Sequence, residues 1–341
     1  MNDLGPSTPQ KAAKPSAARD ALLDLKERIG KSVLGQDHLV ESMLIALLAN
    51  GNVLIESLPG LAKTRAVKTL ARQLAADLSR VQFTPDLLPS DVTGAEIYVQ
   101  TDKGGQFQFQ KGPIFANLVL ADEINRAPAK VQSALLEAME ERQVTVAGKT
   151  YKMPDLFMVL ATENPIEQEG TYPLPEAQLD RFLMHVVVSY PDEATEGEII
   201  KLNRAENAQK LGDHAAAPAP APVPQQAILD ARGEIDGVFV SDLAQKYIVD
   251  LVYATRFPGR YGDPLGKWIQ IGASPRGSLA LDRCARVRAW LDGQEFVTPE
   301  HVRAVMHDCL RHRLILSYEA ISQGVNADKA IDKIAELVAA A

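Results

Sequence analysis

Cysteine, long apolar runs and excess positive charge are all scarce in this sequence. Its 341 residues include only Cys284 and Cys309, whose spacing is not that of a zinc site. No apolar run approaches the ~18 residues that a membrane span needs, and residues 1–20 contain no apolar stretch of the secretory type. We therefore expect a soluble, cytoplasmic protein with reduced thiols.

The charge balance is acidic, with 36 Lys and Arg residues against 44 Asp and Glu residues and a net charge of −8. This balance disfavours extended, sequence-independent binding of nucleic acid. A hydrophobic content of 46% and a charged content of 23% are typical of an ordinary globular protein. The length allows two or three domains, the largest of which has a well-buried core.

The motif SLPGLAKT at residues 57–64 follows the apolar run NVLIE. A loop of small residues between a strand and a helix, closed by Lys-Thr, directs backbone N–H groups at the phosphates of a nucleotide. Lys63 is expected to reach the β- and γ-phosphates, and the Thr64 hydroxyl is expected to bind Mg²⁺. The nucleotide-binding residues predicted in this segment are Ser57, Pro59, Gly60, Leu61, Ala62, Lys63, Thr64 and Arg65.

The loop departs from the general pattern G-x-x-x-x-G-K-[ST] at both glycine positions, which Ser57 and Ala62 occupy. Ala62 is small enough to let the backbone approach a phosphate. Ser57 costs ~1 kcal/mol if its position requires a positive φ. An ordinary strand-to-helix turn with a solvent-exposed Lys63 is the alternative interpretation of this segment.

A second motif, LVLADEIN at residues 118–125, is an apolar strand that ends in two acidic residues. Asp122 is the candidate metal ligand, and Glu123 is the candidate residue that orients or activates a water molecule. Each motif alone is only moderately specific. Together they make ATP hydrolysis the leading prediction for this chain.

Strands and helices alternate between residues 52 and 189, a pattern that predicts a parallel sheet with crossover helices. Both motifs follow strands, so they are expected at the carboxyl edge of the sheet, where such folds bind ligands. Two hairpins are predicted at residues 95–110 and 143–152. The predicted strands are 52–56, 81–83, 117–121, 156–162 and 185–189, with helices at 64–78 and 128–141.

The stretch HAAAPAPAPVP at residues 214–224 divides the sequence, because alternating Ala and Pro cannot pair as a central strand. Beyond it, the apolar residues have helical spacing. The predicted organisation is a flexible tail (1–18), an α/β ATPase core (19–212), an Ala/Pro-rich linker (213–226) and a small all-helical domain (227–341).

The strings ADEINRAPAKVQSALLEAMEERQVTV (121–146) and ATENPIEQEGTYPLPEAQLDRFLM (161–184) closely resemble the MoxR family of AAA+ ATPases. The resemblance implies a P-loop core with a five-stranded parallel sheet, a helical lid, bound ATP and Mg²⁺, and a homo-oligomeric ring, typically a hexamer. It also implies chaperone-like remodelling or maturation of protein complexes, such as metal or cofactor insertion. The implied partner carries a von Willebrand factor A domain.

The resemblance also gives roles to two polar residues near the second string. Asn164 resembles the sensor 1 residue that faces the γ-phosphate; an Asn that caps a turn is the alternative. Arg181 resembles an arginine finger that enters the neighbouring subunit's site, where such a cation is worth about 10³–10⁵ in rate. A salt bridge from Arg181 to Asp180 or Glu176 is the alternative.

Three further positions resemble family features less specifically. Arg276, in the first turn of a helix after Ser-Pro, resembles the sensor 2 arginine that reaches from the lid to the γ-phosphate. Gly35 and Gln36 resemble the turn that contacts adenine. Arg126 is a second candidate for the interface between subunits, with an exposed loop arginine as the alternative.

Three competing functions stay open at this point. The nearest is the small ATPase subunit of a magnesium or cobalt chelatase, whose core is similar. A replicative-helicase type of nucleic-acid motor is disfavoured by the acidic balance and the lack of basic clusters with interleaved aromatic residues. A scaffold that binds nucleotide without hydrolysing it is disfavoured by Glu123 and Arg181.

Overall fold

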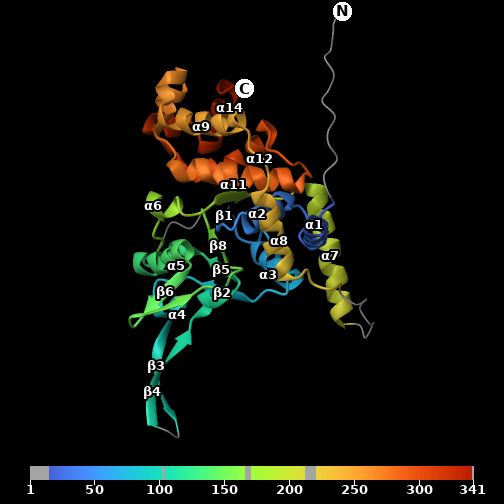
Figure 1. The fold of residues 1–341 in the computed structure, drawn as a ribbon, viewed down its shortest axis with the longest axis vertical. Coiled ribbons are helices and arrows are strands. Elements are labelled where there is room, and N and C mark those ends of the chain that lie inside the picture. Colours follow the sequence, from blue (N-terminus) through green and yellow to red (C-terminus); the bar gives the residue numbers. More distant parts are fainter. Residues whose placement is uncertain (1–14, 102–103, 166–169, 212–219, 340–341) are drawn as a thin grey trace, which may run out of the picture.

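The computed structural model describes residues 15–101, 104–165, 170–211 and 220–339. Its centre is a five-stranded sheet with the order β2-β5-β8-β1-β9, and all neighbouring strands are parallel (Figure 1). This arrangement confirms the predicted fold class. The strands are Val53–Ser57 (β1), Leu78–Gln82 (β2), Leu118–Asp122 (β5), Met158–Glu163 (β8) and Met184–Val188 (β9).

Several helices pack around this sheet through an apolar face. In α1 (Ala17–Ser32), for example, Leu22, Leu25 and Ile29 are buried, and the Ser16 side chain caps the helix by accepting a hydrogen bond from the Arg19 N–H. The other helices of this part are Asp37–Leu48 (α2), Lys63–Gln73 (α3), Pro89–Thr93 (α4), Ala129–Glu141 (α5), Glu176–Leu179 (α6) and Glu193–Leu211 (α7), with 3₁₀ turns at Pro113–Phe115 (η1) and Ile124–Arg126 (η2).

The largest boundary differences from the sequence prediction are at the end of α3 and the start of β2. Helix α3 ends at Gln73 rather than at Leu78, because the chain turns through Ala75 at a φ of 46° and then enters β2. Strand β2 consequently begins three residues before the predicted start at Val81. Helix α7 was not predicted, because its apolar residues do not form one clear stripe.

Two antiparallel hairpins extend the α/β core, as predicted. Strands β3 (Gly94–Thr101) and β4 (Gly104–Lys111) form a long arm that projects from the end of the molecule opposite the C-terminal helices (Figure 1). Strands β6 (Gln143–Val146) and β7 (Lys149–Lys152) form the shorter hairpin. The two are joined where the Phe109 ring stacks on the Tyr151 ring, with centroids 4.0 Å apart.

The C-terminal part is helical, as predicted, and α11 lies across the sheet domain (Figure 1). One feature was not predicted: Ile269–Ile271 (β10) pairs with Ile315–Leu316 (β11), strands too short to show an alternating pattern. The helices are Gln225–Asp236 (α8), Asp242–Arg256 (α9), Leu265–Trp268 (α10), Pro275–Leu291 (α11), Pro299–Leu310 (α12), Tyr318–Ser322 (α13) and Ala327–Leu337 (α14), with 3₁₀ turns at Pro258–Tyr261 (η3) and Arg311–Arg313 (η4).

The predicted boundaries of the tail and the linker can be compared with the starts of α1 and α8. Residues 1–14 and 212–219 lie outside the described residues. Ala17 already belongs to α1 and Gln225 to α8, so the helices begin slightly earlier than the predicted boundaries. Within the linker, Val223 is buried and its N–H donates to the Gln73 carbonyl at 2.7 Å. This segment therefore packs on the α/β core.

Helix α8 also joins the two parts of the chain. Its Glu234 carboxylate accepts hydrogen bonds from the Ser16 hydroxyl at 2.6 Å and from the Trp290 indole at 2.9 Å. These contacts connect the start of α1 with α11. Among the described residues, no helix combines the length and the apolar character that a bilayer crossing requires.

Candidate nucleotide site

The predicted phosphate loop connects β1 to α3. Gly60 has a φ of 87° and Ala62 a φ of 58°, whereas Ser57 is the last residue of β1 and has no positive φ. The left-handed residue without the freedom of glycine is therefore Ala62 rather than Ser57. An alanine in this conformation costs about 1 kcal/mol, and its side chain is the smallest that can occupy it.

Lys63 begins α3 and points back along the loop. Its ammonium group donates to the Ser57 carbonyl at 3.3 Å. Burial lowers the pKa of Lys63, while the nearby carboxylates of Asp122 and Glu123 act in the opposite direction. The structure therefore brings together the lysine of the first predicted motif and both acidic residues of the second, and Lys63 is half-buried.

Asp122 ends β5, and both of its carboxylate oxygens are held by neighbouring strands. Oδ1 accepts a hydrogen bond from the Thr162 hydroxyl at 2.7 Å, and Oδ2 accepts from the Arg80 guanidinium at 2.6 Å. The Asp122 residue is only 8% exposed. Neither Thr162 of β8 nor Arg80 of β2 was predicted, because their partners are far away in the sequence and adjacent only in the folded sheet.

The donor set suits a magnesium ion that arrives with a nucleotide. Mg²⁺ prefers oxygen ligands and is usually held by one or two carboxylates together with phosphate oxygens and water. Asp122 and the hydroxyl of Thr64, which follows Lys63, supply such oxygens. Within the described residues there is no cluster of three or more His, Cys, Asp or Glu side chains that could hold a metal ion alone.

Glu123 sits just beyond Asp122, in the left-handed conformation at a φ of 58°. Its N–H donates to the Thr162 hydroxyl oxygen at 2.9 Å, so one side chain holds both acidic residues. Its carboxylate accepts from the Gln82 amide at 2.7 Å and pairs with Arg126 at 3.1 Å. The structure thus places Arg126 beside Glu123 in the same chain, whereas its predicted contact between subunits remains a prediction.

Asn164 follows β8 and is only 6% exposed. Because β8 lies between β5 and β1, its carboxyl end stands between the acidic pair and the phosphate loop. Asn164 lines a cavity of about 330 Å³ together with Glu56 and Glu163. Burial raises the pKa of the Glu163 carboxyl. The sheet order therefore places Asn164 at the same edge of the sheet as the phosphate loop and the acidic pair.

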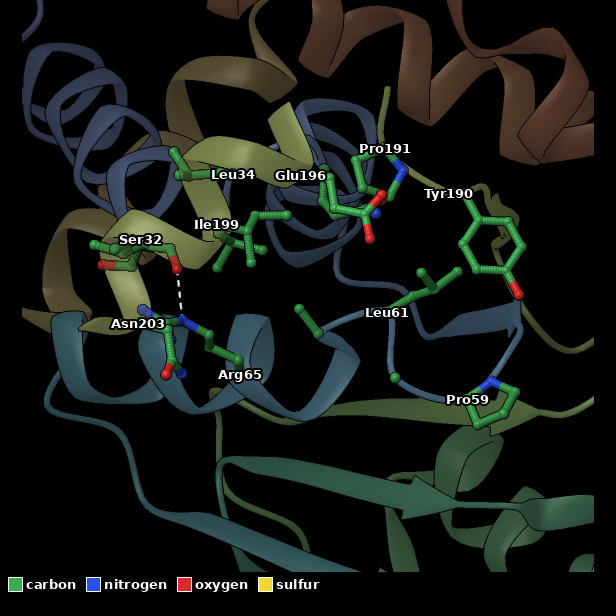
Figure 2. Close-up of a pocket in the computed structure, with 15 residues that line it drawn as sticks. Ser32, Leu34, Pro59, Leu61, Arg65, Tyr190, Pro191, Glu196, Ile199 and Asn203 are labelled. Carbon is green, nitrogen blue, oxygen red and sulfur yellow. Dashed lines mark hydrogen bonds between the residues drawn. The ribbon is translucent and has the colours of Figure 1, made fainter. Parts of the chain in front are cut away.

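A second cavity, of about 290 Å³, adjoins the phosphate loop (Figure 2). Its lining is largely apolar, as a purine base requires, and includes Leu34, Leu61 and Ile199. Helix α7 closes one side of it. Arg65 is anchored here, because its Nε donates to the Ser32 carbonyl at 2.6 Å and its guanidinium pairs with Glu206 of α7.

The predicted adenine turn forms part of this cavity. Gln36 lines it and donates to the Ser189 carbonyl at 3.1 Å. Gly35 has a φ of 74°, and a Cβ at this position would lie 2.7 Å from the Thr195 Cγ2 atom of α7. A side chain at position 35 would therefore be strained and would force the Thr195 side chain to move.

The two remaining candidates lie together on a different part of the molecule. Arg181 pairs with one carboxylate oxygen of Glu140 at 2.8 Å, and Arg276 pairs with the other oxygen. The salt bridge from Arg181 is therefore to Glu140 of α5 and not to Asp180 or Glu176. Both arginines also line a cavity of about 450 Å³ that includes Arg283.

Arg276 was expected to reach the γ-phosphate from the lid. Within its own chain it pairs with Glu140, and its contact with a γ-phosphate stays a prediction. One copy of the chain thus has two separate groups of candidate residues. The first, called the nucleotide cradle below, consists of the phosphate loop, Asp122, Glu123, Asn164 and the cavity beside Gln36. The second is the pair of Arg181 and Arg276.

Comparisons with known proteins agree with this geometry. The model for the ATPase family associated with various cellular activities (AAA) matches residues 52–184, and the AAA lid domain model matches residues 267–334. The chain is 44% identical to Chaperone MoxR1 of Mycobacterium tuberculosis over 334 residues, which are 96% of this chain and 83% of that protein. It is 32% identical to Protein MoxR of Methylorubrum extorquens, covering 87% of this chain and 88% of that protein.

A solved crystal structure of a candidate ATPase from Cytophaga hutchinsonii superposes with a TM-score of 0.85 at 44% identity, covering 94% of this chain and 95% of that one. The parallel sheet, the loop between β1 and α3, and the helical lid define an AAA+ ATPase. The extent of the similarity to the MoxR proteins gives the family: this chain belongs to the MoxR AAA+ ATPases.

Proposed function

We propose that this chain hydrolyses ATP in a ring of identical copies, typically a hexamer, in which each nucleotide site is completed by the neighbouring copy. The observation that carries the proposal is the division of the candidate residues into two groups. Lys63 and Glu123 belong to a nucleotide cradle, whereas Arg181 and Arg276 meet at Glu140 elsewhere on the surface. A cation supplied by a neighbour can stabilise the charge that develops during phosphoryl transfer.

Each residue of the cradle has a distinct task in this proposal. Backbone N–H groups at the start of α3 and the Lys63 ammonium bind the phosphates, and the cavity beside Gln36 accepts adenine. Thr64 and Asp122 hold Mg²⁺, which neutralises phosphate charge when it is bound. Glu123 orients the attacking water molecule. Asn164 fixes the geometry between that water and the terminal phosphate.

The work that hydrolysis drives is proposed to be chaperone-like remodelling or maturation of protein complexes, including metal or cofactor insertion. The relative named Chaperone MoxR1 supports the chaperone-like character. A protein with a von Willebrand factor A domain is the proposed partner. The arm formed by β3 and β4 is a candidate contact for client proteins, because Tyr98 and Phe107 are exposed about halfway along it.

Two single substitutions test the cradle. Lys63→Ala should abolish nucleotide binding, and an unchanged affinity for ATP would remove the assignment of the phosphate loop. Glu123→Gln should still bind ATP but scarcely hydrolyse it. Near-normal turnover would contradict a role of Glu123 in activating water. Isolating Glu123→Gln with ATP from cell extract, followed by identification of the retained proteins, tests the partner.

Mixed rings test the sharing of sites between copies. Neither Arg181→Ala nor Lys63→Ala should be active alone. Mixing them should recover part of the ATPase activity, because an intact phosphate loop on the first variant can meet an intact Arg181 on the second. Absence of recovery at every mixing ratio contradicts a site completed by the neighbour.

A further inference from the structure

We propose that Arg313 is a positioning residue. It connects residues 180–183, which include Arg181, to α11, which carries Arg276. The two arginines then face the neighbouring copy in a fixed arrangement. This inference rests on the proposed function, since it concerns how the second half of the shared site is held. Arg313 itself is buried and touches no nucleotide in this account.

The guanidinium of Arg313 is enclosed by the segment that carries Arg181. Its Nε donates to the Asp180 carboxylate at 2.8 Å, and its Nη2 donates to the carbonyls of Phe182 at 2.7 Å and Asp180 at 3.2 Å. Its Nη1 donates to the Leu183 carbonyl at 3.3 Å. Because these partners flank Arg181 on both sides, η4 of the lid fixes the backbone from which Arg181 projects.

The same carboxylate connects this segment to α11. Asp180 Oδ1 accepts from Arg313, while Asp180 Oδ2 accepts from the Ser274 hydroxyl at 2.7 Å. Ser274 is the N-cap of α11, and its hydroxyl oxygen also accepts from the Arg276 N–H at 3.1 Å. A continuous series of contacts therefore runs from Arg313 through Asp180 and Ser274 to Arg276.

Arginine is suited to this task in a way that lysine is not. Its planar guanidinium presents five N–H donors in a fixed geometry, whereas a lysine ammonium is a flexible point charge. The Arg313 side chain is only 3% exposed, and its Nη1 also donates to the Cys309 carbonyl within the lid. A buried ion pair is weak evidence for stability but can specify a geometry. Catalytic groups need such precision, because a misplacement of about 1 Å can reduce the rate by about 10²-fold.

The test compares Arg313→Lys with Arg311→Lys. Arg311 is also a lid arginine of η4, with a side chain 12% exposed, but it pairs with Asp308 and Asp328 and makes no described contact with residues 180–183. For Arg313→Lys we expect unchanged affinity for a fluorescent ATP analogue and a kcat lower by about 10²-fold. Arg311→Lys should retain most of its kcat at a comparable shift in melting temperature.

Mixed rings separate positioning from general damage to the fold. Arg313→Lys should recover activity when mixed with Lys63→Ala, which supplies an intact pair of arginines, but not when mixed with Arg181→Ala. Ser274→Ala, which removes the two hydrogen bonds of one hydroxyl in the same series but leaves Arg313 in place, should show the same pattern with a smaller loss.

Three results would overturn the inference: a loss of nucleotide affinity in Arg313→Lys, recovery with Arg181→Ala, or an equal kcat loss in Arg311→Lys. The mixture of Arg181→Ala with Lys63→Ala serves as the reference. If that mixture recovers and Arg313→Lys does not follow the expected pattern, only the inference about Arg313 fails. If the reference itself does not recover, the proposed sharing of sites fails and the inference fails with it.

Discussion

At the scale of single residues, the hydroxyl of Thr162 controls the orientation of both acidic site residues. It donates to Asp122 and accepts from the Glu123 N–H, and Thr162 is fully buried. A valine has nearly the same shape but cannot make either hydrogen bond. The partly buried Glu123 N–H would then lack its partner, at a cost of up to about 1–3 kcal/mol.

We therefore predict that Thr162→Val lowers kcat more than it weakens nucleotide binding and also reduces the free energy of unfolding. Thr162→Ser keeps the hydroxyl and should retain most of the activity. Steady-state kinetics together with urea denaturation measure both effects. If the valine and serine variants have the same kcat, Thr162 does not orient the acidic pair.

A histidine between the two parts of the chain makes stability depend on pH. The His38 imidazole of α2 pairs with the Asp308 carboxylate of α12 at 3.0 Å, and this hydrogen bond raises the pKa of His38. The folded state then binds the proton more tightly than the unfolded chain does. The resulting stabilisation is fully present below the ordinary pKa of about 6.5 and is lost as the pH rises through the raised value.

His38→Gln should consequently lower the melting temperature more at about pH 6 than at about pH 8.5. The difference will be modest, because the His38 side chain is 56% exposed and solvent screens the pair. Differential scanning calorimetry of both proteins at the two pH values measures it. An equal loss at both would show that protonation of His38 does not contribute to stability.

The residues that could be predicted from the sequence are those whose role depends on their immediate neighbours. Lys63 follows a small-residue loop, and Asp122 ends an apolar strand, so short strings identify both. Thr162 and Arg80 act across the sheet on partners about forty positions away. A single sequence gives no register between strands, so these two could not be found before the strand order was known.

At the scale of elements, the arm formed by β3 and β4 differs from the rest of the fold in how little it buries. Tyr98 and Phe107 are 61% and 68% exposed and contact each other as a cross-strand pair, with ring centroids 5.4 Å apart. Phe109, nearer the base, instead stacks on Tyr151 and contacts the Phe115 ring. The outer part of the arm is thus attached to the core only through its base.

Replacing Tyr98 and Phe107 together by Ser should therefore cost less than about 1 kcal/mol, the upper end for a cross-strand pair. Phe109→Ala should cost more, because it removes packing between the two hairpins. Urea denaturation of both variants gives the comparison, and a larger loss in the double variant would contradict it. If the arm contacts clients, the double variant should also keep its basal ATPase activity while losing stimulation by a client.

Element boundaries were predictable where a local signal marks them, as at α5, where Pro128 precedes an apolar pattern of helical spacing. The prediction failed where an element depends on distant contacts. Helix α7 is held by Arg65 through Glu206, and α8 is held by contacts with α1 and α11. The local sequence of each helix therefore does not determine where it lies. The short pair of β10 and β11 forms because the lid brings two brief segments together.

At the scale of the whole molecule, the proposed ring requires the same chain to supply both halves of a site. The parallel sheet places Lys63, Asp122 and Glu123 at its carboxyl edge, as expected for this class of fold. The lid packs so that the start of α11 meets α5 at Glu140, which puts Arg276 beside Arg181. The sequence could identify Arg276 as a candidate but not where it lies in the structure, because its place depends on how the lid packs on the core.

This packing predicts how Arg276→Ala behaves in mixed rings. If Arg276 acts on the neighbour's nucleotide, Arg276→Ala lacks a functional arginine pair but keeps an intact cradle. It should then recover activity when mixed with Lys63→Ala and stay inactive with Arg181→Ala, since no interface in the second mixture has a complete arginine pair. Glu140→Gln, which retains the shape of the shared partner but not its charge, should still complement Lys63→Ala. If Arg276 acts within its own chain, the pattern for Arg276→Ala is reversed: it recovers activity with Arg181→Ala and not with Lys63→Ala. ATPase rates across a range of mixing ratios distinguish the two cases.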